Sequence, residues 1–409
     1  MPPTTVQLSS SLRTTPPEVT LARAKIRART LGISRVTDIT RLDRVGLPVY
    51  ASIRPTAAPG SLCVNAGKGL HPIEAEVGAY MEAIEFALAE PGAAKIPIVR
   101  ATVRDVLDGR TRPEAILDLC PRVGSKIRLS APIDCVEAEE ISGTGTRALV
   151  PAELVFIPYR PHARFKGLFG TTSNGLASGN SLREATVHAL CEVIERDVCS
   201  FEAVRDTSVP VDLDTVEGPA RALIETVRAA DLQLFVRTAK NAFGMPYFFA
   251  IINDPDANAP HLLNGGFGCH PYRSVAFVRA VAEAAQSRLS YIHGGRDDLV
   301  KVHERYLRWS KRRKRAFVDA VIARASRGHP VSMQAVDDHT RTVQTVEDCE
   351  AHVLRRFALM GLDRVYRVPF SAPGDELQVV RVIVPRMEMF NESVSRLGVR
   401  LRDHARASA

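Results

Sequence analysis

The stretch EAEVGAYMEAIE, Glu74–Glu85, returns later in the chain as EATVHALCEVIE, Glu184–Glu195. The two copies share Glu, Ala, Val, Ala, Glu, Ile and Glu in the same register. A third copy, Val275–Gln286, keeps both Ala, the Val and one Glu of this pattern but ends in Gln. Such agreement between distant segments is not expected by chance. It places carboxylates at matched helical positions, which is costly unless a cation holds them together.

Each copy follows a glycine-containing segment that we predict to be a loop. These segments are Gly67–Gly69, Thr171–Asn180 and Gly265–Gly268. The copies themselves are predicted helices. Pro72 suits an early position of the first helix and Pro91 ends it, while Asn180 or Ser181 can cap the second.

Loop-helix units with strands nearby predict an α+β fold, built as one large domain with mixed sheets. The segment 21–29 is a plausible basic helix. The strands predicted most clearly are residues 33–40, 232–238, 247–252 and 379–384. We predict that residues 1–18, rich in Thr, Ser and Pro, form a flexible tail, that residues 19–395 form the domain, and that residues 396–409 form a C-terminal tail.

The composition is that of a globular protein, with 45% hydrophobic and 24% charged residues among 409. The net charge of +8 favours anionic ligands, yet the basic run Lys311–Arg315 has no interleaved aromatic residues and predicts a solvated face, not nucleic-acid binding. The seven cysteines form no Cys-x-x-Cys pair, which disfavours zinc and disulfide frameworks. No membrane span or signal peptide is evident, so a cytoplasmic location is predicted.

Helical geometry groups the polar residues of the second copy. At about 100° per residue, Glu184, His188, Glu192 and Glu195 form one stripe beside the apolar stripe. Amphipathic helices often carry glutamates on a solvated face, but here the glutamates repeat as faithfully as the apolar residues. Glu184 and Glu192 are separated by about 12 Å along a straight helix and cannot share one ion. Either two or more ions lie along a triphosphate, or Glu184 precedes the regular helix.

The first copy supplies a shorter acidic face, because Glu82 and Glu85 lie three residues apart. Glycine segments before helices bring backbone amides near phosphate, and Mg²⁺ takes oxygen ligands and bridges phosphates. The residues alone therefore support the hypothesis of metal–nucleotide binding by the paired repeats. Among other polar and aromatic residues, His270 precedes a proline near a repeat loop, where helix entry explains it, and Trp309 is predicted to pack.

These motifs resemble the YcaO family. Ser173-Asn174-Gly175 through Gly179-Asn180, with Glu184 and Glu192–Arg196, looks like its central ATP-binding signature. Gly67–Gly69 followed by Glu82–Glu85 looks like the first signature, and Ala280–Arg288 with Arg296–Asp298 resembles a later region. The match covers about residues 30 to 390 and implies the YcaO-like fold.

The resemblance implies an enzyme that uses ATP to activate a peptide backbone amide. A nucleophile adds to the carbonyl, the amide oxygen takes the γ-phosphate, and phosphate then leaves. Arg196 would contact phosphate as the catalytic residue. The implied Mg²⁺ ligands are Glu82, Glu85, Glu184, Glu192 and Glu195, and the implied ATP contacts are Lys68, Ser173, Asn180, Arg196 and Gln286.

Two branches of the family remain open. Azoline-forming cyclodehydratases use a Cys, Ser or Thr of the substrate, and many end in a Pro-x-Pro-x-Pro tail that this sequence lacks. Thioamide-forming members use sulfide, often with a TfuA-type partner, and the opening Gly32–Pro55, which includes Leu42–Val49, resembles that branch. We therefore expect thioamidation of a ribosomally made peptide or protein. Gly78 stands where the first signature usually has Ser.

Three further expectations concern function class and assembly. A non-catalytic nucleotide-binding partner is disfavoured because the carboxylate set is complete. A two-metal phosphohydrolase lacks its usual His-Asp ligand pairs. The expected partners are a peptide or protein substrate and a TfuA-type protein, without nucleic acid or membrane, and a homodimer is compatible with the sequence.

Overall fold

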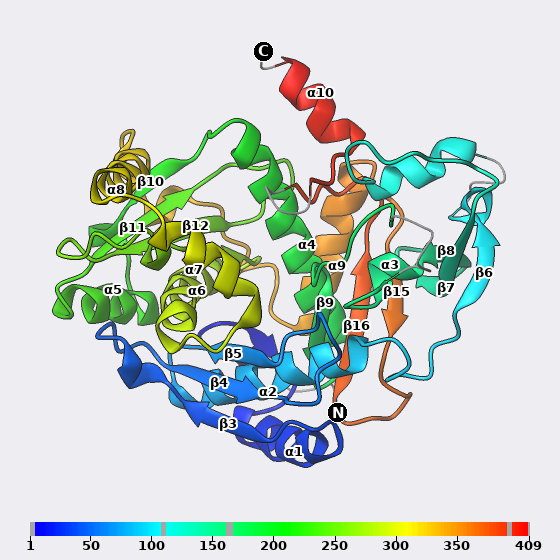
Figure 1. Cartoon of the computed structure of the whole chain (residues 1–409), viewed down its shortest axis with the longest axis horizontal. Helices are drawn as coiled ribbons and strands as arrows, with labels where there is room; N and C mark the ends of the chain where they lie inside the picture. Colours follow the sequence, from blue (N-terminus) through cyan, green and yellow to red (C-terminus); the bar gives the residue numbers. More distant parts are fainter. Residues whose placement is uncertain (1–4, 108–111, 161–166, 391–394, 408–409) are drawn as a thin grey trace. The chain divides into compact units, whose positions relative to one another are not determined.

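The computed structural model describes residues 5–107, 112–160, 167–390 and 395–407 (Figure 1). The chain divides into two compact units, each assembled from separate segments. Unit 1 consists of residues 1–57, 62–84 and 207–345, and unit 2 of residues 58–61, 85–206 and 346–409. The family-like region predicted from the sequence therefore contributes to both units.

Unit 1 contains two larger sheets. Strands β3, β4 and β5 form an antiparallel sheet in that order, and the second sheet has the order β13-β12-β11-β10-β14, with only β10 and β14 parallel. The strands are β1 (Val6–Gln7), β2 (Leu12–Arg13), β3 (Arg35–Asp38), β4 (Val49–Ile53), β5 (Val64–Lys68), β10 (Val209–Asp212), β11 (Gln233–Thr238), β12 (Tyr247–Asn253), β13 (Gly265–Cys269) and β14 (Val331–Ser332).

The helices of unit 1 cover these sheets. They are α1 (Pro17–Thr30), the start of α2 (Pro72–Ala89), α5 (Pro219–Ala229), α6 (Arg273–His293), α7 (Val300–Leu307) and α8 (Lys311–Ser326). The main core joins Leu223 of α5, Phe248 of β12 and Phe277 of α6, all fully buried. A smaller core packs Leu289 of α6 against the three-stranded sheet.

Unit 2 is built on one antiparallel sheet with the order β6-β7-β15-β16-β9, and β8 pairs with β7. Helix α4 packs on β9 and β16, and α9 packs on α4. The strands are β6 (Val99–Thr102), β7 (Pro132–Glu140), β8 (Arg147–Pro151), β9 (Leu176–Gly179), β15 (Tyr366–Pro369) and β16 (Gln378–Ile383). The helices are α3 (Ala152–Val155), α4 (Leu182–Val204), α9 (Val346–Leu359) and α10 (Val399–Ala407).

Each sequence copy is the helical half of a strand–helix unit. The pairs are β5–α2, β9–α4 and β13–α6, and each strand ends the order of its sheet. The glycines explain the close fit. A Cβ on Gly67 would lie 2.0 Å from the Ala79 N atom of α2, and one on Gly268 would lie 1.9 Å from the Ala276 O atom of α6. Only glycine allows such an approach.

The alanines shared by the copies complete this packing. All are fully buried: Ala75, Ala79, Ala185, Ala189, Ala276 and Ala280. A small side chain facing the strand lets the helix backbone approach it closely. This part of the repeat therefore specifies packing.

The predicted α+β class is confirmed, with helices and sheets together. Of the described sheets, only the one that contains β10 and β14 is mixed, and the others are antiparallel. Helix α2 begins at Pro72 and ends before Pro91. Strands β3 and β11 lie within the predicted stretches, and β12 and β16 match theirs to within one residue at each end. The loop predictions were wrong in part, because Gly67 and Lys68 end β5, residues 176–179 form β9, and Gly265–Gly268 belong to β13. Glycine normally signals a loop, but here tertiary packing requires it inside a strand.

The tails also differ from expectation. Within residues 1–18, β1 pairs with β2, and α1 already begins at Pro17. Within residues 396–409, Leu401 of α10 is fully buried. Local composition did not reveal these tertiary contacts. No helix of the described residues has the length and apolarity required to cross a membrane.

Candidate functional site

The acidic stripe of the second copy begins in the first turn of α4. The Ser181 hydroxyl caps the helix by accepting a hydrogen bond from the Glu184 N–H (3.1 Å). The Glu184 carboxylate in turn accepts from the backbone N–H and the side-chain amide of Asn180, both at 3.2 Å. This reciprocal arrangement resembles a capping box and shows that Glu184 lies within the regular helix. The alternative in which Glu184 precedes the helix is excluded.

Further along α4, the stripe is more enclosed than a solvated face. Glu184 and Glu195 are only 2% and 3% exposed, and Glu192 and His188 are half-buried. The Glu195 carboxylate lies 3.2 Å from the Arg196 guanidinium, which remains partly accessible. Burying carboxylates is costly without compensating charge or hydrogen bonds. The enclosure therefore points to a constrained role for this stripe.

A buried arginine supplies part of that compensation. Arg381 of β16 is 1% exposed, and its side chain donates to the carbonyls of Val155, Thr172 and Asn174 at 2.8–3.1 Å. Burial lowers the pKa of Arg381 to about 10, against the opposing effect of the negative charges of Glu192 and Glu85. No sequence pattern had indicated Arg381, because its partners are distant in the chain.

The bonds made by Arg381 also hold the loop that contains Ser173. Because Thr172 and Asn174 are both anchored, Ser173 lies between two fixed residues and its side chain is exposed. Next along the chain, Ser178 of β9 donates to the Glu85 carboxylate (2.5 Å). Unit 2 thus gathers Glu85 and the stripe of α4 with Arg381 and Ser178.

Unit 1 holds the remaining predicted residues near β5. The Ala66 N–H of β5 donates to the Glu82 carboxylate (3.4 Å), and the Gln286 amide donates to the Ala66 carbonyl. The Lys68 ammonium lies 2.8 Å from the Glu283 carboxylate of α6. The structure therefore brings Glu82, Lys68 and Gln286 to one strand, together with Glu283, to which no role had been assigned.

The charge balance around Glu82 is specific. Burial raises the pKa of the Glu82 carboxyl, and this outweighs the lowering effects of Arg296, Lys68 and the Ala66 N–H. A nearby cation would favour the ionised form. Glu82 and Glu85 lie three residues apart on α2. The boundary between the compact units falls between them, after Ile84.

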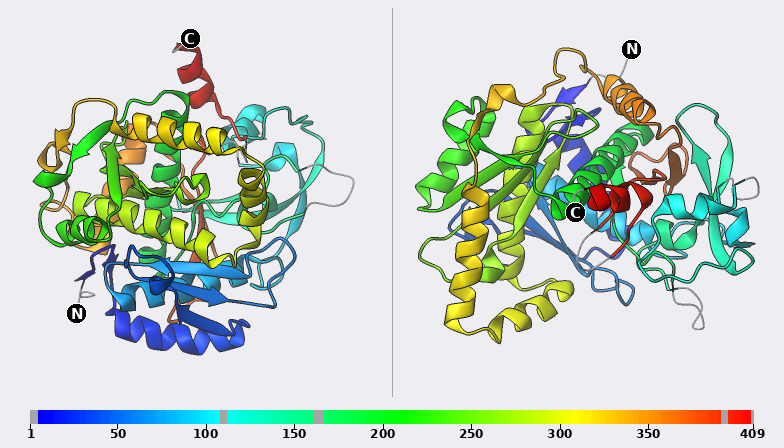
Figure 2. Two further views of the ribbon diagram at one scale, coloured as in Figure 1. Left: turned by 60° about the vertical axis from the view of Figure 1, so that its left-hand side comes forward. Right: turned by 90° about the horizontal axis from the view of Figure 1, so that it is seen from above.

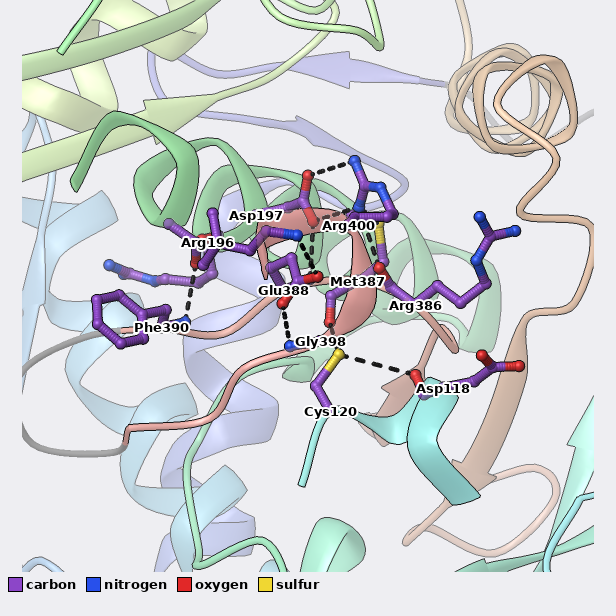
Figure 3. A network of polar contacts seen from close by, with 12 residues as sticks. Asp118, Cys120, Arg196, Asp197, Arg386, Met387, Glu388, Phe390, Gly398 and Arg400 are labelled. Atoms are coloured by element: carbon purple, nitrogen blue, oxygen red, sulfur yellow. Dashed lines mark hydrogen bonds and ion pairs between the residues drawn. The ribbon is translucent and has the colours of Figure 1, made fainter. Parts of the chain in front are cut away.

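Another polar network holds the C-terminal segment to α4 (Figure 3). Asp197, directly after Arg196, accepts the Glu388 N–H at 2.7 Å and both terminal nitrogens of Arg400 at 2.6 and 3.1 Å. The Glu388 carboxylate accepts the backbone N–H groups of Gly398 (2.7 Å) and Leu401 (2.9 Å). Nothing in the repeat pattern had pointed to these residues, and their partners come from distant parts of the sequence.

The donor set suits Mg²⁺. Among the described residues, no three His, Cys, Asp or Glu side chains are grouped closely enough to hold an ion by themselves. Mg²⁺ usually takes one or two carboxylates and completes its shell with water and phosphate oxygens, so a full protein cage is not required. Carboxylate oxygens with few sulfur or imidazole neighbours are the ligands that such an ion prefers.

Comparisons with known proteins agree with this chemistry. The sequence model of the YcaO family, described as YcaO cyclodehydratase, ATP- and Mg²⁺-binding, matches residues 66–388. The predicted cofactors, ATP and Mg²⁺, are therefore those of the matching family. A YcaO structure from Methanopyrus kandleri, bound with AMPPCP and Mg²⁺, shares the fold with a TM-score of 0.74 at 24% identity, over 96% of this chain and 97% of that one.

Two sequence relatives extend the match. An uncharacterized protein of Methanothermobacter thermautotrophicus is 34% identical over 91% of this chain and 94% of its own length. A Rhizobium leguminosarum protein, described as encoded in the tfuA 3′ region, is 31% identical over 92% of this chain and 89% of its own length. By its family match and these relatives, the chain belongs to the YcaO family.

Proposed function

We propose that this protein uses ATP to activate a peptide backbone amide and installs a thioamide in a ribosomally made peptide or protein, together with a TfuA-type partner. The main observation that supports this proposal is the enclosed glutamate stripe of α4 in a chain of the YcaO family. The tfuA location of the Rhizobium relative, which aligns with nearly the whole chain, favours the thioamide branch.

We assign Mg²⁺ binding to Glu82 and Glu85 of α2 and to Glu184, Glu192 and Glu195 of α4. Their oxygen donors support the assignment. Because Glu184 and Glu192 lie two helical turns apart, they bind different ions or contact different parts of one nucleotide. Bound MgATP supplies the γ-phosphoryl group that turns the amide oxygen into a leaving group.

The remaining residues position the nucleotide and neutralise its phosphate charge. Arg196 neutralises phosphate charge while its bond to Glu195 fixes its orientation. Arg381 holds the loop on both sides of Ser173, which we assign to nucleotide binding with Asn180. The Lys68 side chain is held by Glu283, and the Gln286 side chain is held by the Ala66 carbonyl. Both side chains are therefore positioned without a nucleotide. Such a set supplies positioning and charge neutralisation, the main needs of phosphoryl transfer.

Azoline formation is the second candidate function, because the matching family is described as a cyclodehydratase. The two products differ in mass. A thioamide replaces one backbone oxygen by sulfur, whereas azoline formation removes one water from a Cys, Ser or Thr and the preceding amide.

Mass spectrometry of a candidate peptide separates these outcomes. The peptide is incubated with the protein, MgATP, sulfide and a TfuA-type partner, and ADP is measured in parallel. Oxygen-to-sulfur exchange supports the proposal, while loss of water assigns the azoline reaction instead. Absence of ADP with every substrate tested would show a non-catalytic nucleotide-binding protein. The Glu192→Gln variant serves as the control for background chemistry.

A further inference from the structure

A cavity lies on α7 and α8 of unit 1, outside the repeat units. The helices follow one another through the short turn at residues 308–310 (Figure 2). The cavity between their side chains has a volume of about 350 Å³. It is lined by Lys301, Glu304, Arg305, Arg308, Trp309 and Arg313.

The lining is strongly cationic. It carries four cations against the single carboxylate of Glu304, and within the described part of the chain none of these cations forms an ion pair with a carboxylate. The N-terminus of α8 adds positive charge, since the helix starts after Ser310 with the basic run Lys311–Arg315. Unpaired cations converging on one cavity raise the local concentration of anionic ligands.

The aromatic side chains at this cavity hold the two helices together. Trp309 contacts Tyr306 of α7 and Phe317 of α8 edge-on, with centroids 4.9 and 5.5 Å away. The Arg313 guanidinium lies over the Trp309 ring at 4.3 Å. Single-stranded nucleic acids bind through open aromatic faces on which bases stack. Here the aromatic rings are half-buried and engaged, so the site suits carboxylates better than bases.

An exposed apolar residue lies beside this cavity, on a neighbouring face of α7. Leu307 is 61% exposed and precedes the lining residue Arg308, and it is not itself part of the lining. A polypeptide segment that alternates acidic and apolar side chains would satisfy both features, since carboxylates pair with arginine and an apolar side chain covers leucine. A nucleotide or inorganic phosphate would leave the apolar part uncovered.

We propose that the α7–α8 surface, defined by Lys301, Arg305, Arg308, Trp309 and Arg313, binds an acidic segment of another polypeptide. Its carboxylates pair with the arginines and Lys301, while its apolar residues lie on Leu307. This interaction goes beyond the amide chemistry proposed above and requires no ATP, so it can fail or succeed independently.

The fluorescence of Trp309 can report peptide binding at this surface directly, because Trp309 is the only tryptophan in the chain. The intact protein is titrated with a synthetic Glu- and Leu-rich peptide, and tryptophan fluorescence is followed at low and raised salt. We expect saturable binding that weakens with salt. The same peptide with Gln in place of every Glu should bind about tenfold more weakly or worse.

Matched variants locate the site. Arg305→Glu with Arg308→Glu should weaken peptide binding at least about tenfold and leave ATP turnover unchanged. Arg312→Glu with Lys314→Glu changes the net charge equally on α8 without touching the cavity lining and should have a much smaller effect. Circular dichroism checks the fold of both variants.

Three outcomes would overturn the proposal. One is equal affinity for the Glu and Gln peptides, which would remove the role of charge. Another is an equal loss of affinity in both charge-reversal variants, which would leave only a general electrostatic effect. The third is tighter binding of a single-stranded oligonucleotide than of the acidic peptide, which would identify a nucleic-acid surface instead.

Discussion

The second and third copies of the repeat share their packing and differ in their polar residues. In β9–α4 and in β13–α6 the repeated alanines are fully buried between helix and strand. At the ninth repeat position both have glutamate, Glu192 and Glu283, but Glu283 is paired with the Lys68 ammonium. At the twelfth, Glu195 contacts Arg196, whereas Gln286 donates to a backbone carbonyl.

This contrast separates two kinds of sequence constraint. The small residues are required wherever a helix approaches an edge strand closely, so every copy keeps them. The polar positions have no such common requirement: at the ninth and twelfth positions the first two copies have glutamate twice, whereas the third has glutamate and then glutamine. Retention of glutamate at both polar positions in the first two copies, but not in the third, is therefore the informative part of the repeat.

The largest effect is expected when the ninth position is changed in each copy. Glu192→Gln removes a proposed Mg²⁺ ligand and should lower ATP turnover by at least about 100-fold, the scale for losing one charge-stabilising group. Glu283→Gln removes a group bound to Lys68 and should lower it by less than about tenfold. Steady-state ADP formation measures both, with thermal unfolding as the control for folding. Equal effects would mean that the copies do not differ in chemistry.

The shared packing can be tested at its glycines. Gly67→Ala and Gly268→Ala each place a Cβ about 2 Å from backbone atoms of the following helix and should lower the free energy of unfolding by about 2–3 kcal/mol. Gly143→Ala, where a Cβ meets nothing within 4 Å, should change it by less than about 0.5 kcal/mol. Denaturant titration measures all three. If only one of the variants Gly67→Ala and Gly268→Ala destabilised the protein this strongly, the close strand–helix approach would not be equivalent in the two copies.

The structural features that could be predicted from the sequence are those with local signals. Proline positions and apolar periodicity were sufficient for α2 and for β11, β12 and β16, because those signals are local. The strand character of Gly67 and Gly268 was missed, since the reason lies in a helix packed against them. Arg381 was missed too, because its partners, residues 155, 172 and 174, are distant in sequence.

Arg381 sharpens the comparison, because it links the glutamates of the second copy to the loop before β9. Arg381→Gln should raise the KM for MgATP by about tenfold, through loss of loop anchoring and of charge near Glu192. Arg237→Gln is the matched control, since Arg237 is also buried and donates to the carbonyls of Ala325 and Arg327 in unit 1. Both variants should be destabilised. If both raised KM equally, the effect would come from destabilisation alone.

The smallest predicted effect concerns how the helices begin. In the third copy the His270 imidazole accepts the Tyr272 N–H (3.0 Å), whereas the second copy has Gly179 at the equivalent position and uses Ser181 as its cap. Burial, with smaller effects of Arg279 and Arg13, lowers the pKa of His270 from 6.5 to about 3. Below pH 6.5 the unfolded chain therefore binds a proton that the folded protein excludes, so stability is complete above pH 6.5 and falls as the pH drops toward 3.

His270→Asn keeps a side-chain acceptor for the Tyr272 N–H and removes this titration. Relative to its value at pH 8, the free energy of unfolding should fall by about 1 kcal/mol more in the wild type than in the variant at pH 6. Denaturant titrations at both pH values measure the difference. The same slope in both proteins would mean that the imidazole takes up its proton in the folded protein as readily as in the unfolded chain. Protonation would then displace the Tyr272 N–H from the imidazole as the pH falls through about 6.5, so the start of the third helix would depend on pH, whereas the Ser181 cap of the second would not.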